Sequence, residues 1–129
     1  MNVTRLQFVT VPVADHVRAR EFYVDNLGFD VVVDRRGPHG QFVMVAPKGA
    51  QSGLVLVDFD VDGRGFGGPV HLQFHSEDVD QDVDALRANG VEVTDPQDMP
   101  WGRASSLTDP DGNAISLLTP SAMGDRPGW

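Results

Sequence analysis

The chain has 129 residues, and its composition excludes several broad classes of protein. Asp and Glu outnumber Lys and Arg by 19 to 10, and the resulting charge of −9 argues against nucleic acid or an anionic membrane surface as a partner. The chain has no cysteine, which excludes disulfides and thiolate sites. No apolar run is long enough to span a bilayer and the N-terminus carries no basic-then-apolar signal, so we expect a cytoplasmic protein with one domain.

The first half of the chain predicts one helix among four strands. Leu6–Val13 alternates between two faces, and Pro12 places this strand at or near an edge because proline has no N–H group to donate. Asp15 is the expected N-cap of a helix with an apolar stripe. The three strands expected after it are Val31–Asp34, Phe42–Ala46 and Leu54–Phe59.

Two loops in this half carry side chains that suggest possible sites. Arg35–Gly40 is rich in turn residues; a solvated hairpin is the favoured interpretation, and the alternative places its arginines or His39 at the mouth of a cleft, facing an anion. Asp58, Asp60 and Asp62 match the first half of a calcium loop. The match fails at the twelfth position, which is Pro69 instead of Glu, so we favour a strand end that runs into a glycine-rich linker.

The second half predicts a strand, a helix and three further strands. In the first strand, His71, Gln73 and His75 alternate with apolar residues. Asp78 or Asp80 caps the helix, and Asn89-Gly90 ends it. A strand starting at Val91–Val93 and a loop over Asp95–Gly102 that carries Trp101 are expected to follow. Two more strands, Ala104–Thr108 and Ala114–Leu118, flank the turn Asp109–Asn113. The tail, Ser121–Trp129, is either disordered or docked on a partner subunit.

The two halves repeat one unit. Phe8 to Asp15 and His71 to Asp78 both span seven positions, and the next glycine follows 13 positions later in the first half and 12 in the second. Such repetition predicts two tandem β-α-β-β-β modules, at about 3–62 and 70–120, with a linker at 63–69 and a tail at 121–129.

Two stretches carry a resemblance to a known family. V-P-V-A-D-H-V-R-A-R-E-F-Y-V-D-N-L-G-F and P-W-G-R-A-S-S-L-T-D-P-D-G-N-A-I-S-L-L resemble the opening and closing signatures of the vicinal oxygen chelate superfamily, which contains glyoxalase I, bleomycin-resistance proteins and extradiol dioxygenases. The resemblance covers roughly residues 3–120. It implies an α+β fold in which the two modules form a curved mixed sheet around a cleft, and by itself it does not choose among the activities of the family.

The resemblance also implies where metal ligands would lie. The family's metal enzymes place them on the first and last strands of each module, and the matching positions here hold Phe8, Leu56 or Val57, His71 and Ser116. His71 alone is a good ligand, whereas a divalent ion needs about three from His and carboxylate. We therefore expect no catalytic metal and no other cofactor; Zn, Ni, Fe or Mn at His71 is the alternative.

The same positions suggest a ligand site without metal. Strand alternation places on the cleft side the residues that face away from the helices, and Trp101 is expected to close over them. These residues are Phe8, Thr10, His71, Gln73, His75 and Ser116. These aromatic and polar groups suit a flat, partly apolar molecule, and the excess of acidic residues favours a cationic one. His71 has three interpretations, in order of preference: a residue lining a metal-free cleft, a core histidine satisfied by Ser116 or Thr10, and a general base.

The function favoured by these observations is that of a protein that holds or sequesters a small organic molecule such as an antibiotic. The alternative is a metal-dependent lyase or dioxygenase of the glyoxalase type, and metal-independent catalysis by His71 is a third hypothesis. The resemblance also implies a homodimer.

Overall fold

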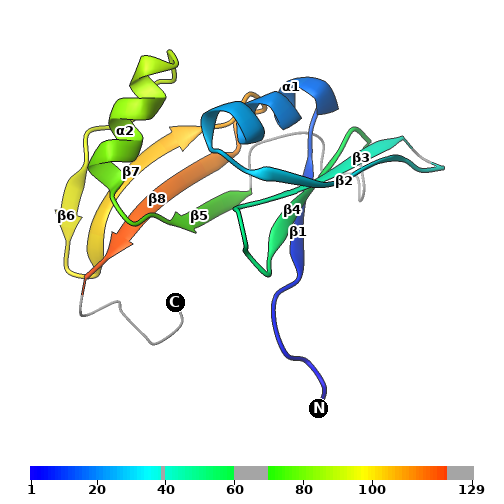
Figure 1. The fold of residues 1–129 in the computed structure, drawn as a ribbon, viewed down its shortest axis with the longest axis horizontal. Coiled ribbons are helices and arrows are strands. Elements are labelled where there is room, and N and C mark those ends of the chain that lie inside the picture. The colour runs from blue at the N-terminus through cyan, green and yellow to red at the C-terminus, as the bar shows by residue number, and fades with distance from the viewer. Residues whose placement is uncertain (39, 60–69, 122–129) are drawn as a thin grey trace. The chain divides into compact units, whose positions relative to one another are not determined.

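The computed structural model describes residues 1–38, 40–59 and 70–121, and the chain divides into two compact units, Met1–Gly67 and Gly68–Trp129. Each unit contains one four-stranded mixed sheet with a helix packed on it (Figure 1). The expected fold class of two tandem β-α-β-β-β modules is confirmed. None of the helices in the described residues is long and apolar enough to cross a membrane.

The sheet of the first unit has the order β1-β4-β3-β2. Its strands are β1 (Phe8–Pro12), β2 (Asp30–Arg36), β3 (Gln41–Ala46) and β4 (Gly53–Val57). β1 runs parallel to β4, and the other pairs are antiparallel. β1 lies at an edge of this sheet, as predicted from the missing N–H group of Pro12.

The helix of this unit begins as an α-helix and widens. Asp15 caps α1 (His16–Glu21) as predicted, because its Oδ1 accepts hydrogen bonds from the backbone N–H groups of Val17 at 2.9 Å and Arg18 at 3.2 Å. The chain then continues as a π-helix, η1 (Phe22–Asn26), which the sequence did not indicate.

The core of the first unit lies between this helix and one face of the sheet. The side chains that are fully buried there come from both layers: Val11, Val13, Ala19, Tyr23, Val43, Val45 and Leu56. An aromatic cluster surrounds Tyr23, whose ring lies 5.4 Å from that of Phe22 and 5.7 Å from that of Phe29, measured between centroids.

The second unit repeats this plan with the order β5-β8-β7-β6. Its elements are β5 (His71–His75), α2 (Val79–Ala88), β6 (Gln97–Met99), β7 (Gly102–Thr108) and β8 (Ala114–Pro120). Of the two predicted caps, Asp78 is the correct one, since its Oδ1 accepts from the backbone N–H of Gln81 at 3.2 Å. Gly90 follows the helix with a φ of +78°, which suits the predicted glycine stop.

The apolar stripe of α2 packs on the sheet of its own unit. Val79, Val83 and Leu86 are buried, and the helix contacts β7 and β8 (Figure 1). The side chains of Leu72, Ile115 and Leu117 are buried on that face of the sheet. The residues that alternate with them therefore lie on the opposite face, which α2 leaves uncovered.

The prediction of a strand at Val91–Val93 is wrong, because the short strand β6 forms later, at Gln97–Met99, inside the predicted loop. The carbonyl of Val93 is occupied by Arg87, whose Nη2 donates to it at 3.0 Å. Pro96, which has no N–H group, then interrupts the ladder just before β6. The backbone still runs beside β7, since Thr94 N donates to the Ser106 carbonyl at 3.0 Å.

The turn between β7 and β8 is held by one buried carboxylate. Asp109 Oδ1 accepts from the backbone N–H groups of Asp111 and Asn113, each at 2.9 Å, and its Oδ2 accepts from Asn113 Nδ2 at 2.8 Å. Gly112 supplies the positive φ, +82°, that the predicted turn requires.

Candidate functional site

The candidate site is a hollow of about 510 Å³ in the second unit, on the face of the sheet opposite α2. Polar side chains from β5, β7, β8 and the segment before β6 line it. They are His71, Glu92, Thr94, Ser106, Thr108 and Ser116. Sequence reasoning had selected only His71 and Ser116 from this set.

Strand register explains why these residues meet. Ser116 pairs with Ser106 on one side and with Gln73 on the other, while Ala114 pairs with Thr108 and with His71. Paired residues in a sheet point to the same face, so two rows of mostly small side chains cross the sheet here. The alternation of Ser106-Leu107-Thr108 and of Val91-Glu92-Val93-Thr94 is visible in the sequence, but nothing in either pattern indicates that these residues meet His71.

A hydrogen bond joins the two site residues that the sequence identified. His71 Nε2 lies 3.0 Å from Ser116 Oγ, and either atom can donate, depending on the tautomer of the imidazole ring. Ser116 is thus the partner named in the interpretation of His71 as a core histidine. The core placement itself is wrong, because His71 is exposed and remains available to a second molecule.

The other predicted residues of this unit lie outside the hollow. Gln73 shares a row with Ser116 but is not among the lining residues, and His75 is level with Leu118, with its Nε2 3.4 Å from Glu77 Oε1. Trp101 precedes Gly102, which pairs with Pro120, whereas His71 pairs with Ala114. Six steps along β8 correspond to about 20 Å, so the unit does not bring Trp101 over the hollow beside His71.

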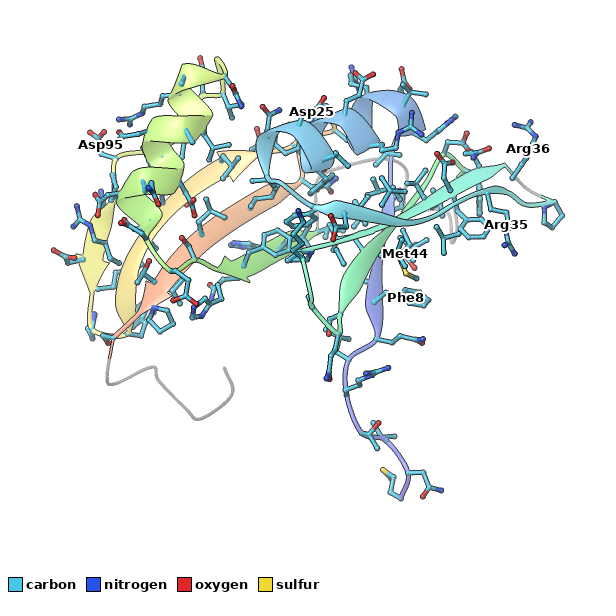
Figure 2. The ribbon with its side chains drawn as sticks, viewed as in Figure 1. Phe8, Asp25, Arg35, Arg36, Met44 and Asp95 are labelled. Atoms are coloured by element: carbon cyan, nitrogen blue, oxygen red, sulfur yellow. The ribbon has the colours of Figure 1, made fainter. Side chains whose placement is uncertain are left out.

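Phe8 and Thr10 belong to the first unit, on the face of its sheet away from α1. Phe8 is 39% exposed, and Figure 2 shows it on the same side of the sheet as Met44, opposite the helical residue Asp25. The register pairs Thr10 with Val55, which is paired in turn with Met44, so the three residues form one row across the sheet. This face is therefore mainly apolar, in contrast to the polar hollow of the second unit.

The arginines of the β2–β3 hairpin are exposed, as the favoured interpretation of that loop expects. Arg35 pairs with Phe42 and shares the face of Met44, while Arg36 points elsewhere at the end of β2 (Figure 2). His39, which belonged to the alternative interpretation, lies outside the described residues.

The candidate calcium residues are only partly described. Asp58 Oδ1 accepts from the backbone N–H of Gln41 at 2.8 Å, and its Oδ2 lies 3.2 Å from His16 Nδ1, a pairing that the sequence did not indicate. Both carboxylate oxygens are thus engaged within the first unit, which ties the end of β4 to β3 and α1. Asp60 and Asp62 lie outside the described residues.

The residues present do not fit the metal that the family's enzymes use. Phe8 cannot coordinate an ion, Leu56 and Val57 are buried hydrocarbon, and Ser116 is a neutral hydroxyl already bonded to His71. Within residues 1–38, 40–59 and 70–121, no three His, Asp or Glu side chains gather closely enough to hold a metal ion.

On the α2 side of the second sheet, Arg103 joins three elements. Its Nε and Nη2 donate to the two carboxylate oxygens of Asp80 at 2.9 and 3.0 Å, and its Nη1 donates to Asp98 Oδ1 at 3.0 Å. The hydrogen bonds from Arg103 lower the pKa of Asp80, and those to Asp80 and Asp98 raise the pKa of Arg103. This cluster fixes the start of α2 to β6 and β7 and lies away from the hollow.

Comparison with known proteins gives consistent matches. The model of the Glyoxalase/Bleomycin resistance protein/Dioxygenase superfamily matches residues 5–117. The solved structure of TnmS3, described as an antibiotic binding protein from Streptomyces sp. CB03234, is 43% identical with a TM-score of 0.88, and the match covers 94% of this chain and 99% of that one.

Two further relatives extend the comparison. A glyoxalase/bleomycin resistance protein from the same Streptomyces is 41% identical with a TM-score of 0.79, over 89% of this chain and all of that one. The uncharacterized protein YetH of Bacillus subtilis (strain 168) is 31% identical over 117 residues, which is 89% of this chain and 98% of YetH.

Proposed function

Because this chain belongs to the Glyoxalase/Bleomycin resistance protein/Dioxygenase superfamily, as its sequence signatures predicted, we propose that it binds a small organic molecule and does so without a catalytic metal. The observation that carries the proposal is the hollow of the second unit. Its lining offers hydroxyl groups and an imidazole for hydrogen bonds, and it offers no set of ligands for a divalent ion.

The physical chemistry of the hollow suits binding. Its volume of about 510 Å³ is large enough to receive part of a drug-sized molecule. The groups of His71 and Ser116 are held by their mutual hydrogen bond, so less side-chain freedom is lost when a ligand binds to them. The description of TnmS3 as an antibiotic binding protein supports an antibiotic as the class of ligand.

Isothermal titration and thermal shift with a panel of aromatic antibiotics, neutral metabolites and anionic metabolites test the proposal. We expect a subset of the antibiotics to bind and raise the melting temperature. His71→Ala and Ser116→Ala each lose the bonds that they make to the ligand, which weakens its binding by about 3- to 10-fold. Ser121→Ala is the matched control, because Ser121 Oγ bonds the Pro100 carbonyl at the other end of the sheet.

Two results would contradict the proposal. The first is that no compound of the panel binds. The second is a purified protein that carries close to one Zn, Ni, Fe or Mn ion per chain and loses it in the His71→Ala variant, which would favour the metal-dependent lyase or dioxygenase instead.

We also propose the homodimer that the sequence resemblance implied. Sedimentation equilibrium is expected to give about twice the chain mass of 14.0 kDa, and a single species of 14.0 kDa at micromolar concentration would rule it out.

A further inference from the structure

We infer that the hollow of the second unit receives a hydroxylated ring that bears a protonated amine, as in an amino sugar substituent of an antibiotic. The inference rests on the proposed binding function and assigns the chemistry of one part of the ligand. It comes from how side-chain size, hydroxyl groups and charge are distributed around the hollow.

The hollow has a floor of small side chains between two longer ones. Ala114, Ser116 and Ser106 belong to the two central strands, β8 and β7, while His71 stands on β5 at one side. Glu92 comes from the segment that runs beside β7 at the other side, two residues before the contact of Thr94 with Ser106. Three strand spacings separate these two sides, about 14 Å, which leaves room for one substituted six-membered ring.

The groups on the floor suit a ligand that both donates and accepts hydrogen bonds. A hydroxyl side chain has one donor and two acceptor sites, so Ser106, Thr108 and Ser116 match the hydroxyl groups of a sugar in either direction. The oxygen of Thr94 already accepts from Ser106 N at 2.9 Å, which fixes the edge of the floor. A purely aromatic ring would make no hydrogen bonds with the hydroxyl groups of Ser106 and Thr108, which a sugar can use.

Charge selects an amine over an acid. Among the described residues that line the hollow, Glu92 carries a carboxylate and none is Lys or Arg. A ligand carboxylate or phosphate would face Glu92 without a lysine or arginine beside it, while a protonated amine gains a charged partner. The net charge of −9 on the chain acts in the same direction.

Three related probes separate the parts of the ligand: daunorubicin, which carries an amino sugar; N-acetyldaunorubicin, in which the amine is neutral; and the sugar-free aglycone daunomycinone. Isothermal titration at low salt is expected to give affinities in that order. Glu92→Gln should weaken daunorubicin by about 2- to 5-fold and leave N-acetyldaunorubicin unchanged, as expected for one partly exposed ion pair. Glu77→Gln is the control, since it removes an equal charge from an exposed glutamate that pairs with His75 outside the hollow.

The outcomes distinguish this inference from the proposed function. Equal affinity for the three probes, or equal weakening by Glu92→Gln and Glu77→Gln, overturns the amino sugar assignment and leaves the binding function standing. If none of the three binds while other antibiotics of the panel do, the assignment also falls alone. If no compound binds at all, both fall.

Discussion

The carboxylate of Asp109 is expected to be a sensitive polar group of the second unit, because it accepts three hydrogen bonds within the turn that joins β7 to β8. Asp109 is 4% exposed and Asn113 is fully buried. Asp109→Ala leaves two buried donors of Asn113, the backbone N–H and Nδ2, without the acceptors they now use. At about 1–3 kcal/mol for each buried unpaired donor, we expect a loss of about 4 kcal/mol in the free energy of unfolding.

Asp109→Asn provides a graded comparison. Asn113 Oδ1 has no hydrogen-bond partner among the described residues. Rotation of the Asn113 amide by a half turn would let this oxygen accept from the new amide group at position 109, while the remaining oxygen there still accepts from the backbone. The side-chain amide group of Asn113 then stays unpaired, and we expect a loss of only about 2 kcal/mol in the free energy of unfolding.

Urea denaturation followed by far-UV circular dichroism measures both losses. The expected order is wild type, then Asp109→Asn, then Asp109→Ala, with unchanged slopes of free energy against urea. If the two variants lose equal stability, or if Asp109→Ala loses less than about 1 kcal/mol, the buried hydrogen bonds of Asp109 are not what holds this turn.

Three further predictions concern stability, and melting temperatures check each. Asp80→Asn should lower the melting temperature at pH 7 and have little effect well below pH 3.8. The reason is that Arg103 lowers the pKa of Asp80 on folding, so the ionised carboxylate stabilises the fold above its unfolded pKa, and this contribution disappears as the pH falls through the folded pKa. An equal effect at both pH values contradicts this. Gly102→Ala should destabilise the β7–β8 pair, because φ is +152° and the added Cβ would lie 2.4 Å from the Thr119 carbonyl oxygen; an unchanged melting temperature counts against it. Leu86→Ala, at a side chain only 2% exposed, should cost about 2–5 kcal/mol by leaving a cavity under α2, and a loss below about 1 kcal/mol would mean that this stripe is not packed as described.

The sequence predicted the features that depend on local chemistry. Asp15 and Asp78 cap their helices because an aspartate oxygen reaches backbone N–H groups two or three residues ahead, whatever the rest of the chain does. Pro12 on an edge strand and the turn at Asp109–Asn113 follow from single-residue constraints in the same way. The spacing of strand, cap and glycine signals was enough to find the repeat of two modules, and the family resemblance implied the fold that they form.

Features that depend on distant partners escaped prediction. The segment after Gly90 has an apolar-acid-apolar pattern typical of a strand. However, the Arg87 side chain of α2 donates a hydrogen bond to one of its backbone carbonyl groups, and the local sequence pattern does not indicate this bond. Glu92 and Thr94 line the hollow because this segment runs beside β7, where Thr94 and Ser106 exchange hydrogen bonds, and the local sequence does not report that contact. Trp101 was placed over the site on chemical grounds, whereas the register of β7 and β8 puts it at the other end of the sheet.

The π-helical turn at Phe22–Asn26 makes this helix tolerant of a change in chain length. In a regular α-helix, one inserted residue rotates everything after it by about 100°, which would turn buried side chains outward. A π turn absorbs the extra residue within itself and leaves the following chain in place. The first module has one more residue between cap and glycine than the second, and yet both helices are followed by a glycine in the same left-handed conformation, Gly28 with a φ of +72° and Gly90 with a φ of +78°.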